Sequence, residues 1–145
     1  MKQFLTVLIV CWTAALASAA EPQWFVDFEK AKEKAKTEKK LIFMNFTGSD
    51  WCPPCAMFAK YVASDPAFQA FAKNNLVLVE VDFPRRKPMS NEQRAANEAL
   101  GAQMKASNVL PTYVVLDSDA KELKRFHYRG EDGKAFVAML EKIKK

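Results

Sequence analysis

The hydrophobic residues that follow position 23 recur at helical spacing. Successive members lie four, three and four positions apart: Trp24, Phe28, Ala31 and Ala35. This period, with lysines on the opposite side, predicts one amphipathic helix within residues 24–40. The next stretch, LIFMNF at 41–46, is apolar on both of its alternating faces. We therefore expect a strand there that helices cover on both sides, and no strand before it.

The middle of the chain continues this alternation of helices and strands. A helix is predicted from Cys55, and Asp65 followed by Pro66 has the pattern of an N-cap and a first helical residue. LVLVEVDF at 76–83 predicts a second buried strand, parallel to the first because a helical crossover separates the two. The following helix has capping-box spacing and then one apolar face: Ser90, Gln93, Ala96, Leu100 and Met104.

The last third of the chain predicts an antiparallel hairpin and a closing helix. The two strands are TYVVLD at 112–117 and LKRFHYRG at 123–130, and Asp119 in the turn is expected to take a positive φ. The final helix buries one apolar face: Phe136, Val137, Leu140 and Ile143. The whole order predicts an α/β fold with a central mixed β-sheet flanked by helices on both faces.

The first 20 residues have the pattern of an export signal. Lys2, an apolar run at 4–16 and the small residues Ala17-Ser18-Ala19 predict a signal peptide at 1–20 that is cleaved. The apolar run at 4–16 is shorter than the roughly 20 residues that a membrane-spanning helix needs. The alternative to a cleaved signal is an uncleaved membrane anchor. A lipoprotein signal would have a small residue directly before the lipidated cysteine, but Val10 precedes Cys11. We therefore expect Cys11 to be removed together with the cleaved signal peptide. The mature domain, 21–145, is then secreted into a bacterial periplasm without a membrane attachment.

The charge of the chain gives little indication of a function. The 145 residues carry a formal net charge of +5, and most lysines lie at 29–40 and 141–145 among glutamates. Such runs are typical of solvated helix faces, and no aromatic residues are interleaved with them as in a nucleic-acid site. We therefore expect no nucleic-acid partner. After signal cleavage the chain keeps two cysteines, Cys52 and Cys55.

These two cysteines stand in the sequence FTGSDWCPPCA, where the first buried strand gives way to a helix. A helix start favours a thiolate, because backbone N–H groups and the helix dipole both stabilise negative charge there. Cys52 has the position where this effect is largest, and Cys55, one turn further in, is expected to be more sheltered. Such a pair can close and open a disulfide with little backbone movement and exchange electrons with another protein.

Three other uses of the pair compete with this interpretation. A structural disulfide across two residues removes little entropy from the unfolded chain, so it would stabilise the fold only slightly. A zinc site would need four ligands, and the mature chain offers only His127 as a further nitrogen or sulfur donor. Attachment of a c-type haem needs a histidine directly after the second cysteine, and residue 56 is alanine.

The strand–turn–WCPPC–helix unit resembles the active site of the thioredoxin superfamily. NVLPTYVVLD at 108–117 is similar to the second signature of that family, a cis proline followed by a strand. The segment FTGSDWC, with VDFPRRKPMSNEQRAANEAL further on, is most similar to exported bacterial thioredoxin-like proteins of the thiol–disulfide interchange type. The resemblance covers residues 24–145 and implies the thioredoxin fold and a protein-disulfide oxidoreductase.

The resemblance also implies a role for each matching residue. Cys52 would be the attacking thiolate and Cys55 the resolving cysteine, together forming the redox-active disulfide. Trp51 would flank the site, Pro111 would be the cis proline opposite Cys52, and the backbone of Leu110 would bind a peptide strand. No metal, flavin or nucleotide is implied. The partners would be the thiols and disulfides of exported proteins, together with an upstream redox protein that recharges the pair.

The sequence departs from the family at the buried acid that helps to deprotonate the resolving cysteine. Asn45 or Phe46 occupies that position, depending on the length of the turn, and neither can accept a proton as a carboxylate does. Pro53 and Pro54 remove two N–H donors beside Cys52, which favours a less depressed thiolate pKa and a more reducing pair. The direction predicted on this ground is reductase rather than oxidase.

The chain also carries a basic segment and one histidine, and a rival function is consistent with the same fold. Arg85-Arg86-Lys87 follows a parallel strand and should lie near the active-site end, where it docks an acidic partner or is a solvated loop. His127 alternates with Phe126 and Tyr128 on an outer strand, so it should face solvent without a catalytic role. The rival function is a peptide-binding or chaperone module of the same fold that keeps Cys52–Cys55 as an inert disulfide.

Overall fold

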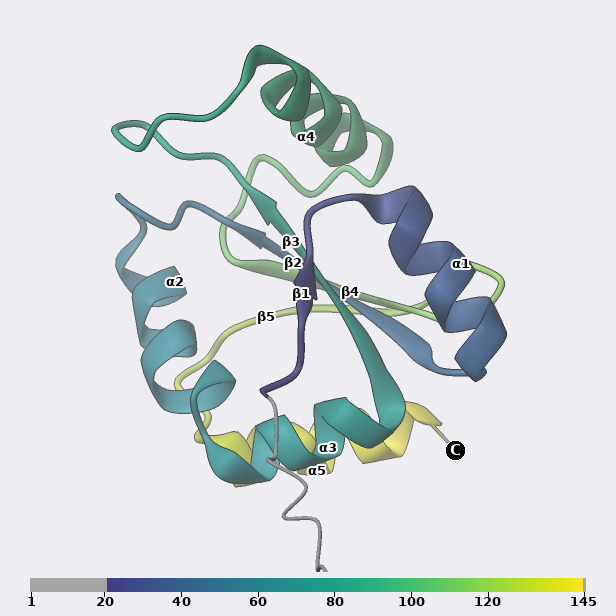
Figure 1. Ribbon diagram of the computed structural model, residues 1–145. Coiled ribbons are helices and arrows are strands. Elements are labelled where there is room, and N and C mark those ends of the chain that lie inside the picture. Colours follow the sequence, from purple (N-terminus) through teal and green to yellow (C-terminus); the bar gives the residue numbers. More distant parts are fainter. Residues whose placement is uncertain (1–20, 145) are drawn as a thin grey trace, which may run out of the picture.

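The computed structural model describes residues 21–144, and the expected signal peptide with Cys11 therefore lies outside the described residues. Figure 1 shows a central sheet with helices packed around it. The elements, in chain order, are β1 (Trp24–Phe25), α1 (Phe28–Glu38), β2 (Leu41–Thr47), α2 (Pro53–Phe58), η1 (Ala59–Ala63), α3 (Pro66–Asn75), β3 (Leu76–Asp82), α4 (Asn91–Gln103), β4 (Thr112–Leu116), β5 (Glu122–His127) and α5 (Gly133–Lys144).

The five strands form one mixed sheet in the order β1-β3-β2-β4-β5. β2 and β3 are parallel, as the helical crossover predicts, whereas β4 runs antiparallel to both β2 and β5. The carboxyl ends of β2 and β3 therefore lie beside the start of β4 at one end of the strands. The α/β fold with a mixed sheet between helices is confirmed.

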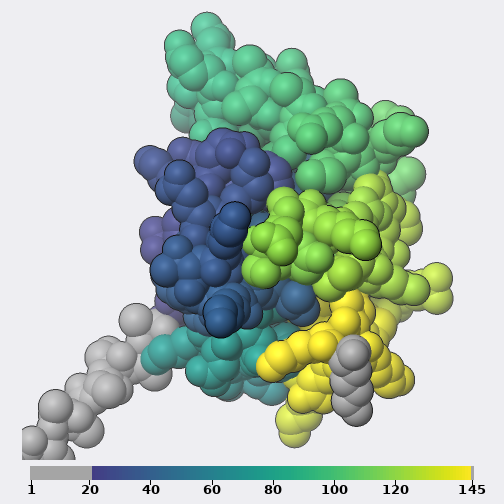
Figure 2. All heavy atoms as spheres, turned by 90° about the vertical axis from the view of Figure 1, so that its right-hand side faces the viewer, coloured from purple at the N-terminus to yellow at the C-terminus, as the bar shows by residue number. Residues whose placement is uncertain are grey.

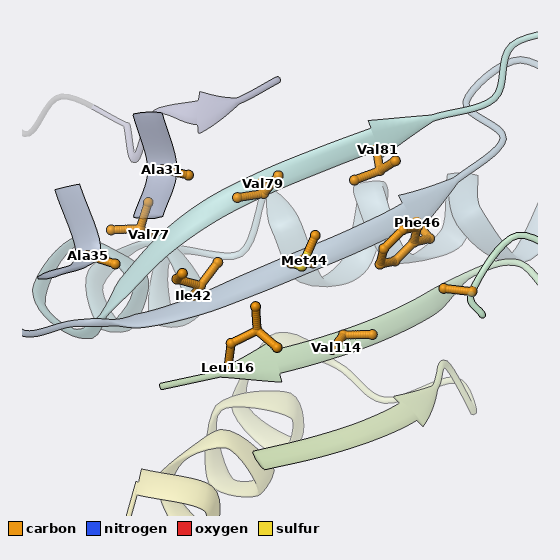
Figure 3. Packing of buried hydrophobic residues seen from close by; sticks show 11 residues of the cluster. Ala31, Ala35, Ile42, Met44, Phe46, Val77, Val79, Val81, Val114 and Leu116 are labelled. Atoms are coloured by element: carbon orange, nitrogen blue, oxygen red, sulfur yellow. The ribbon is translucent and has the colours of Figure 1, made fainter. Parts of the chain in front are cut away.

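One face of the sheet packs against α1 and α4. Mostly aliphatic side chains of β2, β3 and β4, together with Phe46, form its core and contact two alanines of α1, as Figure 3 shows. Ala31 and Ala35 are fully buried and let the helix approach the sheet closely, which confirms the helical face predicted from their spacing. Residues 83 and 100 add partly buried side chains from the α4 side.

The other face of the sheet is aromatic and is covered by α2, η1, α3 and α5. Phe43 is fully buried at its centre, and its ring lies 5.4–6.2 Å from five other rings. Those rings come from β1, α2, α3, β4 and α5: Trp24, Phe58, Phe68, Tyr113 and Phe136. Edge-on and offset arrangements of this kind add to the stabilisation from burial alone. The apolar face predicted for the last helix is confirmed, since Phe136 and Leu140 are fully buried.

The N-terminal segment differs from the prediction. A two-residue strand, β1, pairs in parallel with β3, and the helix begins only at Phe28. Asp27 is the N-cap, and its carboxylate accepts the backbone N–H groups of Glu29 and Lys30 at 3.0 and 3.2 Å. The expectation of a helix from Trp24 without a strand before β2 was therefore wrong, because the aspartate cap sets the helix start.

Helix ends elsewhere follow the capping residues. Asp65 caps α3 and Ser90 caps α4, each through its side-chain oxygen, as predicted. The α4 face is shifted, however: Asn97 and Gly101 are buried, whereas Ala96 is exposed. Asn97 is fixed there because its side chain donates to the carbonyl of Asp82 at 2.8 Å. Figure 2 shows α4 and the segment before it, in green, projecting at one end of the molecule.

The turn between β4 and β5 also differs from the prediction. Ala120 has the positive φ, at 64°, and Asp119 does not. The carboxylate of Asp117 accepts the backbone N–H groups of Asp119 and Lys121 at 3.0 and 2.9 Å. These bonds hold the turn in a shape that places Ala120, rather than Asp119, in the left-handed region. The strands are shorter than predicted, ending at 116 and 127.

Candidate functional site

The loop between β2 and α2, residues 48–52, carries the first cysteine to the start of a helix. We call it the active-site loop. Cys52 is the N-cap of α2, with extended backbone, and donates its N–H to the carbonyl of Gly48 at 2.9 Å. Cys55 lies in the first turn of α2, and the two cysteines form a disulfide with their Cα atoms 5.3 Å apart. α2 thus begins at Pro53, directly after Cys52 and two residues before the start predicted at Cys55.

The two prolines leave few N–H donors around Cys52. Pro53 and Pro54 are the first two residues of α2, and neither has a backbone N–H. The amide of Ala56 is already bonded to the carbonyl of Cys52 at 3.1 Å. The amide of Cys55 is therefore the one backbone donor in the first three helical positions, where an ordinary helix would have three.

Both cysteines are buried in the disulfide form. Cys52 is 6% exposed and Cys55 is 4% exposed, so the expected difference in shelter is small. Their positions on the helix distinguish them more clearly. Cys52 is at the helix start, where the dipole acts most strongly, and Cys55 is on the same buried side as Phe58, three residues on.

Pro111 is in a cis peptide bond with Leu110, as the resemblance to thioredoxins implied. Pro111 is buried and directly precedes β4, whose first residue, Thr112, pairs with Phe46 of β2. The cis bond therefore lies at the end of the sheet where β2 leads into the active-site loop. His127 is exposed, as predicted, and its Nδ1 lies 3.1 Å from the carbonyl oxygen of Pro111.

Trp51 is fixed beside Cys52 by contacts on three sides. Its indole N–H donates to the carbonyl of Phe83 at 2.7 Å. The guanidinium of Arg85 lies 3.8 Å from the centre of the indole ring, which is a close cation–π contact. The ring also covers Gly48 so closely that a Cβ there would lie 2.5 Å from a ring carbon. Trp51 therefore links the active-site loop to the residues that follow β3.

Asp50 binds the backbone of the segment after β3. We call residues 84–89 the basic loop. The Asp50 carboxylate accepts the N–H groups of Arg85, Arg86 and Lys87 at 3.0, 2.7 and 2.7 Å. These bonds, above all the one from the Arg85 backbone, lower the pKa of Asp50 from 3.8 to about 2. In Figure 1 the two loops lie side by side. The predicted nearness of Arg85–Lys87 to the active site is confirmed.

The sheet face under α2 carries polar side chains at the active-site end. Asn45 is on the same face as Phe43, the face that α2 covers, and Phe46 is on the opposite face. Asn45 is 6% exposed, and its side-chain oxygen has no hydrogen-bond partner in the described residues. The hydroxyl of Tyr113, the pairing partner of Asn45 on β4, has none there either.

Glu80 is the ionisable group that the sequence analysis missed on this face. It pairs with Asn45 across β2 and β3, and it follows Leu78, which faces α2. Burial raises the pKa of Glu80, Asp82 raises it further, and Lys87 opposes the effect. The signal was visible in LVLVEVDF, where one carboxylate interrupts a run that is otherwise apolar up to Asp82.

The comparisons with known proteins agree with this geometry. A model of a thioredoxin-like family matches residues 23–118. The chain belongs to the thioredoxin-like family. Disulfide bond reductase DsbH of Chlamydia pneumoniae is 36% identical over 124 residues, which is 86% of this chain and 74% of that protein. A solved structure of DsbH oxidoreductase matches with a TM-score of 0.80 and 33% identity, and the match covers 95% of this chain and 94% of that one.

A second thioredoxin-like relative is the thioredoxin-related protein DsbJ of Chlamydia pneumoniae. It is 30% identical over 109 residues, which is 75% of this chain but 31% of DsbJ. This chain is therefore similar to one part of that longer protein. Both relatives are bacterial proteins named for disulfide or thioredoxin chemistry, and this chain is a thiol–disulfide protein of the same superfamily.

The residues that the resemblance to thioredoxins implies for the site come from separate parts of the chain. The active-site loop and α2 carry Trp51, Cys52 and Cys55. The segment before β4, at the same end of the sheet, carries Leu110 and Pro111. Within residues 21–144 no group of three or more His, Cys, Asp or Glu side chains is arranged to hold a metal ion. None of the helices in this part of the chain is both long and apolar enough to span a membrane.

Proposed function

We propose that this protein is a secreted disulfide reductase that works through Cys52 and Cys55. The observation that carries the proposal is the Cys52–Cys55 disulfide at the start of α2, in a first turn that has lost two N–H donors to proline. With fewer donors the Cys52 thiolate is stabilised less, so the dithiol form gives up its electrons more readily. The similarity to a protein named as a disulfide bond reductase supports the same direction.

The reaction is two successive thiol–disulfide exchanges. The Cys52 thiolate attacks one sulfur of the client disulfide, so that a mixed disulfide forms and the other client sulfur leaves as a thiolate. Cys55 then loses its proton and attacks the Cys52 sulfur, which forms the Cys52–Cys55 disulfide and releases the second client thiolate. Two electrons pass from the cysteine pair to the client, and the structure corresponds to the protein after this transfer.

Glu80 takes the part of the proton acceptor for Cys55 in this proposal. Asn45 cannot accept the proton, and Glu80 lies directly across from it on β3, on the face that α2 covers. A carboxylate whose pKa is raised by burial is a better base than an exposed one, which suits the deprotonation of a thiol.

Trp51, Leu110 and Pro111 form the client-binding side in this proposal. Leu110 directly precedes the cis proline at the end of the sheet. An extended client segment would form hydrogen bonds with the Leu110 backbone there. The clients are exported proteins with disulfides, and the residues 1–20 are the signal that brings the protein to the periplasm. A separate redox protein returns two electrons to the cysteine pair after each turnover.

Two single-cysteine variants test this function. Cys52→Ser should abolish reduction of a disulfide-linked client such as insulin, because the attacking thiolate is missing. Cys55→Ser should also stop turnover but should accumulate a mixed disulfide through Cys52, visible by mass spectrometry. Each variant keeps one thiol and so controls for the other. If Cys52→Ser left client binding intact and the parent protein turned over no disulfide, the peptide-binding module would be the better account.

A further inference from the structure

The basic loop presents two arginines that form no ion pair within the described part of the chain. Arg85 and Arg86 are exposed, and neither forms an ion pair with any carboxylate of residues 21–144. Lysines of α1, by contrast, pair with glutamates of the same helix, as in Lys34–Glu38. The lysines of that helix therefore have glutamates beside them, whereas the two arginines have no carboxylate paired with them in residues 21–144.

The carboxylates nearest to the basic loop are occupied by other donors. Asp50 accepts three backbone N–H groups, so it fixes the path of the loop through its main chain. Asp82 accepts both the N–H and the hydroxyl of Ser49. Lys87 turns toward this group, since its Nζ lies 3.2 Å from the hydroxyl oxygen of Ser49. Two of the three cations of the loop, Arg85 and Arg86, therefore remain for a partner.

The position of Arg85 relates this charge to the cysteines. Its guanidinium stacks on the ring of Trp51, the residue directly before Cys52. Stacking leaves the edge of a guanidinium free to donate two parallel hydrogen bonds to a carboxylate. A carboxylate held there would lie next to the residue that flanks the reactive sulfur.

We propose that Arg85 and Arg86 dock clients that carry carboxylates next to their disulfide. The proposal rests on the reductase function and specifies its substrate class: protein disulfides with aspartate or glutamate within a few residues of the attacked cysteine. The three backbone hydrogen bonds to Asp50, which we call the Asp50 clamp, hold the main chain of the two arginines in place before the client arrives, so little loop entropy is lost on binding. Lysine would serve less well, because the stacked, two-pronged contact is particular to arginine.

The test compares two disulfide-linked peptides in three forms of the protein. The peptides differ only beside the cysteine, where one has Asp-Glu and the other Asn-Gln. The proteins are the parent, Arg85→Gln/Arg86→Gln, and the control Lys36→Gln/Lys39→Gln, which removes two exposed positive charges from α1 and its C-cap. The readout is the ratio of kcat/KM for the acidic peptide over the amide peptide, with dithiothreitol-reduced protein as the electron source.

The parent and the control should prefer the acidic peptide by about tenfold at low salt, and the arginine variant should bring the ratio to about one. The preference should shrink as salt is raised, because the contact is exposed to solvent. An equal ratio in all three proteins would overturn the docking proposal and leave the reductase function standing.

A binding measurement separates this proposal from the reductase function. Both peptides can be made with the cysteines replaced by alanine, and their affinity for the oxidised protein measured by calorimetry. If the parent reduced neither peptide, the reductase function would fail, yet docking would still be supported by tighter binding of the acidic peptide that the arginine variant loses. Equal affinity of both peptides for the parent would overturn docking independently of any electron transfer.

Discussion

The close approach of Gly48 and Trp51 gives the sharpest mutational test of the active-site loop. In Gly48→Ala the new Cβ would lie 2.5, 2.6 and 2.8 Å from three atoms of the indole ring. An ordinary contact begins at 3.4 Å, so the ring has to retreat by about 1 Å. The ring is not free to do so, because its N–H is bonded to the Phe83 carbonyl and Arg85 covers one face.

The expected cost follows from these contacts. Overpacking against a fixed ring costs about 1–3 kcal/mol, and a weakened indole hydrogen bond adds about 0.5–1.5 kcal/mol. Alanine also restricts the unfolded chain, which offsets about 0.4–1 kcal/mol, since Gly48 does not have a positive φ. The free energy of unfolding of Gly48→Ala should therefore fall by about 0.5–4 kcal/mol.

A double-mutant cycle with Trp51→Ala isolates the cause. Urea unfolding of the parent, each single variant and the double variant gives four free energies of unfolding. In the Trp51→Ala background the clash is gone, so adding Gly48→Ala should be neutral or stabilise by up to about 1 kcal/mol. The same loss in both backgrounds would refute the reasoning, because the cost would then not come from the indole ring.

Three other predictions address the loop clamp, the acid under α2 and the aromatic core. Asp50→Asn should speed tryptic cleavage after Arg85 or Arg86 by about fivefold or more, read by mass spectrometry, because the loop opens locally when its charged acceptor is lost; an unchanged rate would argue against the clamp. Burial raises the pKa of Glu80, so its contribution to stability is complete below its ordinary pKa of 4.5 and is lost as pH rises through the higher folded value. The stability of Glu80→Gln relative to the parent should therefore increase from pH 4 to pH 8 in chemical denaturation, and a difference independent of pH would contradict this. Phe43→Ala should lower the free energy of unfolding by about 3–5 kcal/mol, since its ring contacts five others in a fully buried position; a loss below about 1 kcal/mol would show that the cluster can close around the gap.

The sequence predicted the parts of the fold that have strong local patterns. The two parallel strands, the hairpin and the caps at Asp65 and Ser90 were correct, because each depends on residues within one short segment. The cis bond at Pro111 was predicted from the family resemblance and is confirmed. Composition and spacing alone could not have given it, since most X-Pro bonds are trans.

The errors arose where a distant contact determines the local structure. β1 has two residues, too few for a pattern, and it exists because β3 offers an unpaired edge. The buried face of α4 is shifted because Asn97 bonds to the end of β3, fifteen residues earlier. Ala120 takes the positive φ because Asp117 binds the turn, which no propensity for the single residue would indicate.

The same limit applies to the candidate site. The CPPC pair and Trp51 were evident from one segment, whereas the clamp of Asp50 on Arg85–Lys87 joins residues that are 35 to 37 positions apart. Glu80 was missed because its relation to Asn45 depends on the register of β2 and β3. Periodicity predicts which strands are buried, but the register decides which polar side chains meet.

The most direct test of the central claim is the reduction potential of the Cys52–Cys55 pair, measured in residues 21–145 equilibrated with glutathione buffers. A reductase with two prolines at the helix start should have a potential near that of thioredoxin, roughly −270 mV. A value near roughly −120 mV would contradict the account, since such a pair would be an oxidant that forms disulfides in its clients.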